Sequence, residues 1–158
     1  IQNSRIQYDT DTVVVRLFNT YGPGEWFHPF RSVNCLFCYN LLHNKPITVF
    51  KGHTRTSTYI YDAVDAIANI ADNFKDGMVY NIASRDHHTI EQLAEHVLKY
   101  TGADRGLVDF RNHSEILTTK DKFVDPKLAE RDLKMSSTMS LDQGVKETIN
   151  WMRKYYNL

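Results

Sequence analysis

The residues of this chain that are best suited to chemistry gather where an apolar run ends. Residues 12–17 are mostly β-branched, and they are followed by Asn19 and then by Gly22, Pro23 and Gly24. An amide at the carboxyl end of a strand lies in the crevice where open α/β sheets bind ligands. Glycines around a proline let the chain turn sharply and approach a ligand closely. The stretch predicts a small-molecule site, and the alternative is a plain turn with a surface asparagine.

The loop that follows, GEWFHPFRS, carries four more groups suited to a polar ligand. Glu25 offers a carboxylate, Trp26 a stacking face, His28 a titratable ring and Arg31 an anchor for an anion. Sugars are often recognised by groups of these kinds. Surface exposure without a role is the alternative for each of them.

The two cysteines, Cys35 and Cys38, lie in SVNCLFCYNLLH, whose pattern predicts a helix with both thiols on one face as small apolar residues. A C-x-x-C pair could also serve in redox chemistry or hold a metal, but a zinc site needs more ligands and the sequence has no second pair. No metal-ligand spacing connects the seven histidines either. We therefore expect no metal site, and reduced cysteines favour the cytoplasm.

Strands and helices alternate along the chain, which predicts an α/β fold. Apolar runs at 12–17 and 78–82 predict strands buried on both faces, as in a parallel sheet. Thr89 and Gln92 fit a capping box that opens a helix reaching about Tyr100. The other expected strands are at 47–50 and 107–110. Further helices are expected at 32–43, at 62–74 (N-cap Asp62, buried stripe Val64, Ile67, Ala68 and Ala71) and at 126–133 (N-cap Asp125). Ser140 and Gln143 fit a second capping box, which opens a last helix with Val145, Ile149 and Met152 on one face.

Size and composition limit the class of protein. The 158 residues suffice for one domain with a core, and 42% hydrophobic with 24% charged residues is typical of soluble globular proteins. Lys+Arg and Asp+Glu number 19 each, so the overall charge gives no support for binding nucleic acid or an anionic membrane. No apolar run approaches the roughly 20 residues that span a bilayer. We expect neither nucleic acid nor membrane as a partner, whereas acidic small molecules stay compatible with the sequence.

The order of these stretches resembles the C-terminal half of nucleotide-sugar epimerases and dehydratases of the extended short-chain dehydrogenase/reductase family. The collinear motifs are FNTYGPGE, KPITVF, HTRTSTYIYDAVDAI, MVYNIAS, and DPKLAERDL with SLDQGVKETINW. The resemblance implies that residues 1–158 form the C-terminal part of such an enzyme. In it, the last strands of a Rossmann-like parallel sheet, near 12–17 and 78–82, are interleaved with a small C-terminal substrate-binding lobe.

The resemblance also implies roles for individual residues. Asn19 would lie where the last large strand meets the sugar nucleotide, and Arg55 would hold the diphosphate, with a solvated surface arginine as the alternative. Thr56 and Ser57 stand where the family usually has an aspartate and a larger residue. The candidate substrate-binding residues are Asn19, Glu25, Arg31, Phe50, Arg55 and Lys122, and the candidate cofactor contacts are Phe18 and Asn19. For Lys122 (or Lys120) an exposed loop lysine, and for Phe50 (or Val49) core packing, are the alternatives.

Two motifs of the family are not found in this sequence. One is the G-x-x-G-x-x-G fingerprint that cradles the NAD pyrophosphate, and the other is the Tyr-x-x-x-Lys pair whose tyrosine is the general base. We therefore expect no catalytic residue in this chain and NAD bound mainly by an N-terminal half of the enzyme. That half would be a partner needed for stability, covalently or as a second chain, and a homodimer is a further possible assembly.

Three functions follow from this interpretation. The first is the nucleotide-diphospho-sugar-binding part of an NAD-dependent epimerase or dehydratase that acts through a 4-keto intermediate. The second is a non-catalytic module that binds sugar nucleotides. The third is a reductase of the same fold with a non-nucleotide substrate, which would have little need of Arg55.

Overall fold

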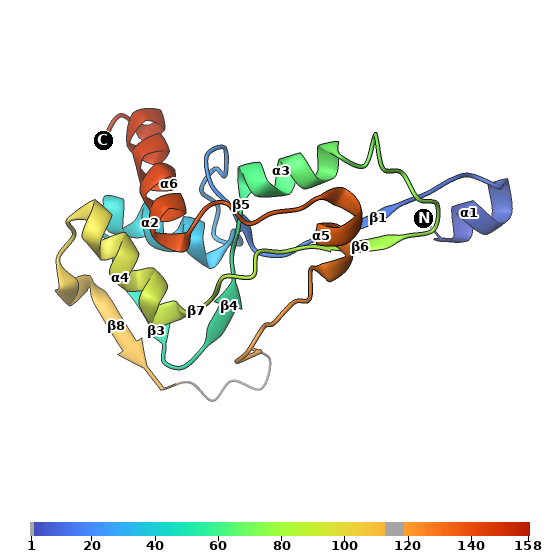
Figure 1. The fold of residues 1–158 in the computed structure, drawn as a ribbon. Helices are drawn as coiled ribbons and strands as arrows, with labels where there is room; N and C mark the ends of the chain where they lie inside the picture. Colours follow the sequence, from blue (N-terminus) through green and yellow to red (C-terminus); the bar gives the residue numbers. More distant parts are fainter. Residues whose placement is uncertain (1, 113–118) are drawn as a thin grey trace.

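The computed structural model describes residues 2–112 and 119–158. It has the α/β fold that the sequence predicts (Figure 1). Its buried hydrophobic residues form two clusters, one against a parallel strand pair and one among three helices. We call them the sheet core and the helical core.

The sheet core is built on β1 (Val14–Leu17) and β6 (Val79–Ile82). The two strands pair in parallel, with Val14 opposite Val79 and Leu17 opposite Ile82, so the strands predicted at 12–17 and 78–82 are confirmed. Helices α3 (Ile60–Ala68) and α5 (Lys127–Leu133) pack on the pair. The buried residues of the sheet core are Ala63, Ala66, Tyr80, Ile82, Ala129, Leu133 and Met135.

Within this chain β1 is not buried on both faces, although its apolar pattern is that of a strand covered on both sides. Val14 and Val15 are only half-buried, and Leu17 is 52% exposed. Among the described strands β1 pairs with β6 alone, and α5 packs chiefly against β6. The apolar side chains of β1 therefore lack the second layer that their pattern calls for.

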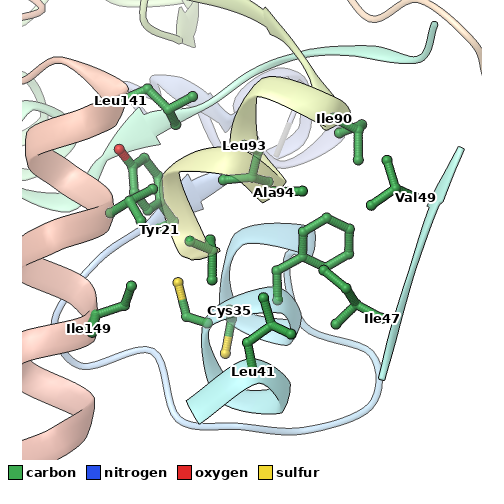
Figure 2. Close-up of a cluster of buried hydrophobic side chains, with 14 of the residues drawn as sticks. Tyr21, Cys35, Leu41, Ile47, Val49, Ile90, Leu93, Ala94, Leu141 and Ile149 are labelled. Carbon is green, nitrogen blue, oxygen red and sulfur yellow. The ribbon is translucent and has the colours of Figure 1, made fainter. Parts of the chain in front are cut away.

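The helical core lies among α2 (Val33–Leu42), α4 (Ile90–Thr101) and α6 (Leu141–Tyr156). These helices pack beside β3 (Ile47–Phe50) and β8 (Val108–Arg111), a second parallel pair. Figure 2 shows side chains of α2, α4, α6 and β3 meeting in this core. The face predicted for the last helix is confirmed, because Val145, Ile149 and Met152 are fully buried.

Short strand pairs connect the two cores. β2 (Thr20–Tyr21) pairs in parallel with β5 (Thr58–Tyr59), and β4 (Thr54–Thr56) pairs in antiparallel with β7 (His87–Thr89). The remaining described elements are α1 (Gln2–Tyr8) and the 3₁₀ turn η1 (Arg105–Leu107). Of the residues with candidate functions, Arg55 lies on β4 and Asn19 directly precedes β2.

The predicted capping box of α4 is confirmed. The Thr89 hydroxyl accepts a hydrogen bond from the Gln92 N–H at 3.1 Å, and Gln92 Oε1 accepts one from the Thr89 N–H at 2.8 Å. Gly102, with φ of 71°, ends the helix in the left-handed conformation that favours glycine. The first turn of α6 is capped as predicted, since Ser140 Oγ accepts from the Gln143 N–H at 3.3 Å.

Helix α3 differs from its prediction at its start and in its buried face. It begins at Ile60 after Tyr59, so Asp62 is not the N-cap. Asp62 is buried in the first turn, and its carboxylate accepts hydrogen bonds from the Thr138 hydroxyl (2.6 Å) and the Met139 N–H (3.3 Å). The helix buries Ala63 and Ala66, whereas the predicted stripe residues Val64 and Ile67 are 48% and 39% exposed. Tight packing on the strands selects the small residues for the buried face.

Helix α5 begins one residue later than predicted. Its N-cap is Pro126, and Asp125 precedes the cap. The Asp125 carboxylate still accepts a hydrogen bond from the Lys127 N–H at 3.1 Å. It therefore satisfies a donor of the first turn, although it lies one residue before the N-cap. Within the described ranges, none of the helices has the length and apolar character needed to cross a membrane.

Candidate functional site

Asn19 lies at the carboxyl end of β1, directly after the last paired residues. Its φ is 42°, a left-handed conformation that asparagine tolerates better than most residues. Its side-chain Nδ2 donates to the Thr56 carbonyl at 2.8 Å, and its own carbonyl accepts from the Thr58 N–H at 3.2 Å. Asn19 therefore joins the end of β1 to the segment that carries Arg55. Its Oδ1 has no hydrogen-bond partner among the described residues and can accept from a ligand.

A cavity of about 370 Å³ lies immediately after Asn19. Residues 20–25, Arg31 and Ile60 line it. Gly22 makes the turn at its wall with φ of 140°, and a Cβ placed there would come within 2.6 Å of Ile60 Cγ2. The sharp turn predicted from the glycines and proline is thus the wall of a cavity, with two of the predicted loop residues, Glu25 and Arg31, in its lining.

Glu25 and Arg31 differ in how they are held. Both Glu25 oxygens are engaged by Ser32: one accepts from its N–H at 3.1 Å and the other from its hydroxyl at 2.8 Å. Partial burial raises the pKa of the Glu25 carboxyl, and these two hydrogen bonds act in the opposite direction. The Arg31 side chain is exposed and makes no hydrogen bond or ion pair with another described residue.

Arg55 lies outside this cavity, on β4. Its Nη1 donates to the carbonyls of Thr54 (2.6 Å) and Lys120 (3.2 Å), which leaves Nε and Nη2 without a partner in the described part of the chain. Partial burial lowers the pKa of Arg55, and the nearby Asp121 carboxylate raises it. Asp121 itself accepts hydrogen bonds from Thr54 and His87. Asn19 and Arg55 are thus connected through the backbone of Thr56, but they do not line one described cavity together.

The remaining predicted residues are more scattered. Lys122 is exposed, and its carbonyl accepts from the Thr56 hydroxyl at 3.5 Å, so its backbone adjoins the Arg55 segment. Phe50 ends β3 with its ring centroid 5.7 Å from that of His53. Phe18 directly precedes Asn19, and both its backbone groups are used: the N–H donates to Ile82 and the carbonyl accepts from Thr58.

A buried polar chain beside Arg55 was not predicted. The Ser57 hydroxyl lies 3.1 Å from Asn34 Oδ1 and 3.2 Å from His88 Nε2, and all three residues are buried. Because Asn34 Oδ1 can only accept, the Ser57 proton points to it, and His88 Nε2–H donates to Ser57. His88 is also paired with Arg55 across β4 and β7. The departure of Ser57 from the family pattern was a signal in the sequence for this buried polar group.

The two cysteines are buried on a helix, as the sequence predicts. Cys35 and Cys38 are both fully buried and unpaired, in the helical core. Burial raises the pKa of the Cys35 thiol to about 12 and raises that of Cys38 as well. They are structural residues of α2.

Comparison with known proteins places this geometry in a family. The model of the NAD-dependent epimerase/dehydratase family matches residues 1–83. A UDP-N-acetyl-alpha-D-glucosaminuronate decarboxylase of Bacillus cytotoxicus is 30% identical over 91% of this chain and 47% of its own length. The human dTDP-D-glucose 4,6-dehydratase is 24% identical over 99% of this chain and 46% of its own. The chain spans about half the length of the curated relatives that it matches.

Solved structures share the fold. The Thermotoga maritima UDP-glucose 4-epimerase with UDP-glucose matches 98% of this chain and 50% of its own, with a TM-score of 0.86 and 24% identity. The Bordetella bronchiseptica enzyme WbmF in complex with NAD+ and UDP matches 98% of this chain and 50% of its own, with a TM-score of 0.80 and 29% identity.

Proposed function

This chain belongs to the NAD-dependent epimerase/dehydratase family, and on that premise we propose that it is the part of such an enzyme that binds a nucleotide-diphospho-sugar. The observation that carries the proposal is the Asn19–Thr56 hydrogen bond, which ties the carboxyl end of β1 to the segment of Arg55. A cavity begins at the residue after Asn19. The Asn19 acceptor, the Arg55 guanidinium with its free donors and the cavity thus lie on segments that are joined by this hydrogen bond.

In this scheme the residues of the chain bind and orient the substrate. The free Nε and Nη2 donors of Arg55 suit a diphosphate, because guanidinium donors match phosphate oxygens in pairs. Asn19 Oδ1 accepts from a hydroxyl of the ligand, and the loop from Glu25 to Arg31 closes over the sugar. Lys122 adds positive charge at the Arg55 segment, and Phe50 contacts the base. Positioning of this kind is what brings a sugar C4 hydroxyl to its reaction partners.

The cofactor assigned to the family fits the chain at one point only. The Phe18 ring and the Asn19 side chain would contact NAD at the carboxyl end of β1, where parallel sheets bind dinucleotides. When bound, NAD supplies the hydride acceptor for oxidation of the sugar to its 4-keto form and returns the hydride afterwards. The chain has no Tyr-x-x-x-Lys pair, so the proton chemistry belongs to another part of the enzyme.

The proposal includes an N-terminal half that holds most of the cofactor. Supporting it is a set of exposed apolar side chains on α1, β1 and α3: Ile6, Tyr8, Leu17, Tyr61, Val64 and Ile67. The half-buried strand β1 has the pattern of a sheet interior, which a further strand and layer would complete. The unpaired cysteines suit a reducing compartment, so we place the enzyme in the cytoplasm. The homodimer stays a prediction.

The test is calorimetric titration of the natural protein that contains this chain with UDP and with dTDP. Replacing Arg55 by alanine should weaken binding of the nucleotide by about 1.5–3 kcal/mol, because charge-assisted hydrogen bonds to phosphate are lost. Arg105→Ala is the matched control, since it removes a surface guanidinium that pairs with Glu95 on α4. An Arg55→Ala affinity equal to that of the control would remove Arg55 from the site and favour a substrate without phosphates.

A further inference from the structure

The wall of the cavity includes a loop, residues 22–31, that contains neither helix nor strand. Gly22 and Gly24 in this loop both have positive φ, and glycine gives the backbone more conformational freedom than any other residue. Lining residues of the cavity flank residues 26–30 on both sides. The shape of this wall therefore depends on what residues 26–30 contact elsewhere in the molecule.

Phe27 is held by the end of α6 and by α2. Its N–H donates to the hydroxyl of Tyr156, the last residue of α6, at 3.1 Å. Its ring stacks on that of Tyr39 of α2, with the centroids 3.8 Å apart and the ring planes at 14°. Tyr39 in turn meets the Tyr156 ring edge-on, at a centroid distance of 5.2 Å. Tyr156 therefore supports Phe27 both directly and through Tyr39.

Trp26 contacts the same turn of α6. Its ring centroid is 5.1 Å from that of Tyr155, and Tyr155 stacks on Trp151 of the preceding turn at 5.2 Å. Trp26 is 57% and Tyr155 43% exposed, so the contact lies at the surface, outside the helical core. Aromatic pairs of this kind stabilise a structure beyond the area that they bury.

The hydrogen bonds at the tip and the ends of the loop are of a different kind. At the tip, the N–H groups of Phe30 and Arg31 donate to His28, so these bonds stay within the loop. The bonds between Glu25 and Ser32 fasten the two ends of the loop to each other. The contacts of residues 26 and 27 with α6 and α2 therefore determine where the middle of the loop lies.

We propose that Tyr155 and Tyr156 are positioning residues for substrate binding, because they hold the loop where it covers the sugar. This inference rests on the proposed function and adds two residues that lie outside the lining of the cavity. Both act on the affinity for the sugar part of the ligand, through Trp26 and Phe27. Arg55 lies on β4, outside the cavity, so the affinity for the free nucleotide should not depend on them.

The experiment uses the natural protein that contains this chain and measures its affinity for a free nucleotide and for the glucose and N-acetylglucosamine conjugates of that nucleotide. UDP or dTDP is used, whichever binds in the test of Arg55. The unaltered protein should bind at least one conjugate more tightly than the free nucleotide. Tyr156→Phe removes only the hydroxyl that accepts from Phe27, and it should weaken that conjugate roughly two- to tenfold, the range of one uncharged hydrogen bond. The affinity for the free nucleotide should not change.

Two substitutions at Tyr155 test the second contact. Tyr155→Ala removes the ring beside Trp26 and should also weaken the conjugate alone, whereas Tyr155→Phe keeps the ring and should bind like the unaltered protein. Tyr100→Phe is the matched control, because it removes a hydroxyl that donates to Asp142 at 2.6 Å and joins α4 to α6. It should lower the melting temperature and leave every affinity unchanged, which distinguishes lost stability from a displaced loop.

Hydrogen exchange followed by mass spectrometry reports on the loop itself. Amides of residues 22–31 should exchange faster in Tyr156→Phe and in Tyr155→Ala than in the unaltered protein, while those of α4 should keep their rates. If both variants bind the conjugate as tightly as the unaltered protein does, the inference is overturned, whatever the exchange rates.

The remaining failures are distinguishable. Equal weakening of the conjugate and the free nucleotide would mean that the end of α6 supports the nucleotide site or the whole fold, so the inference would be overturned while the proposed function stands. The same follows if neither conjugate binds more tightly than the free nucleotide, since the loop then adds nothing to binding. If neither UDP nor dTDP binds the unaltered protein, the proposed function fails and this inference fails with it.

Discussion

At the scale of single residues, Gly22 is the most constrained position of the cavity wall. Its φ of 140° disfavours any side chain, and an added Cβ would meet Ile60 Cγ2 at 2.6 Å. Gly24, on the same turn, has φ of 93° but open space around its Cβ position. Alanine substitutions at the two glycines therefore distinguish the cost of backbone strain, present at both, from that of steric overlap, present only at Gly22.

We expect Gly24→Ala to cost about 1–3 kcal/mol of unfolding free energy, from backbone strain alone. Gly22→Ala should cost roughly 1–3 kcal/mol more than that, because the new methyl group also overpacks against Ile60. Denaturant unfolding of the two variants measures the difference. Equal costs would show that Ile60 moves aside and does not fix the turn.

The cysteines lead to a second prediction at this scale. Since burial raises the pKa of Cys35 to about 12, and that of Cys38 in the same direction, neither thiol forms appreciable thiolate at pH 8 in the folded protein. Alkylation by iodoacetamide at pH 8 should be very slow in the native state and fast in denaturant, as followed by mass spectrometry. Rapid native labelling of either cysteine would contradict its place in the helical core.

At the scale of elements, the pairing of β4 with β7 includes a buried histidine, His88. His88 Nε2 donates to Ser57, while its Nδ1 is buried and has no hydrogen-bond partner among the described residues. Burial lowers the pKa of His88, and the nearby Asp86 acts in the opposite direction.

The sign of the pH dependence follows from this shift. Above the ordinary histidine pKa of 6.5, His88 is neutral in both the folded and the unfolded chain, and the stability is fully present. As the pH falls through 6.5, the unfolded chain takes up the proton first, so unfolding is favoured until the folded pKa is passed. Melting temperatures between pH 8 and pH 5 should therefore fall more steeply for the natural protein than for His88→Gln. The exposed His28→Gln serves as the control, and parallel curves for His88→Gln and the natural protein would refute the prediction.

The elements also show what the sequence could specify. The caps of α4 and α6 were predictable because Thr89, Gln92 and Ser140 act through local hydrogen bonds. The buried face of α3 was not, because alanines occur on several sides of the helix and only tertiary packing selects among them. The same limit applies to the site. Glu25 and Arg31 are close in sequence and were found together, whereas the buried chain from Asn34 to His88 is assembled by long-range folding.

At the scale of the whole molecule, apolar side chains of α1 and α3 remain uncovered. On α3, Tyr61 is 60% and Val64 48% exposed, and on α1 Ile6 is 84% exposed. Exposed apolar surface of this kind marks an interaction site or a site of aggregation. The proposed N-terminal half would cover it.

We expect residues 1–158, expressed alone, to aggregate or to lack a sharp thermal transition, as judged by solution size and near-UV circular dichroism. Substituting Val64 and Ile67 with lysine should make this isolated chain more soluble. The same pair of changes should destabilise a longer protein in which the proposed N-terminal half covers these residues. A soluble monomer of the unaltered chain with cooperative melting would contradict the expected dependence on that half.

The two cores are built from alternating segments of the chain. The sheet core takes residues from 13–15, 63–82 and 129–135. The helical core takes residues from 21–60, 90–110 and 139–156. No single cut separates the two cores from each other, so neither can be exchanged as one continuous segment of the chain. A fragment produced by any cut between Val15 and Met139 has at least one core incomplete.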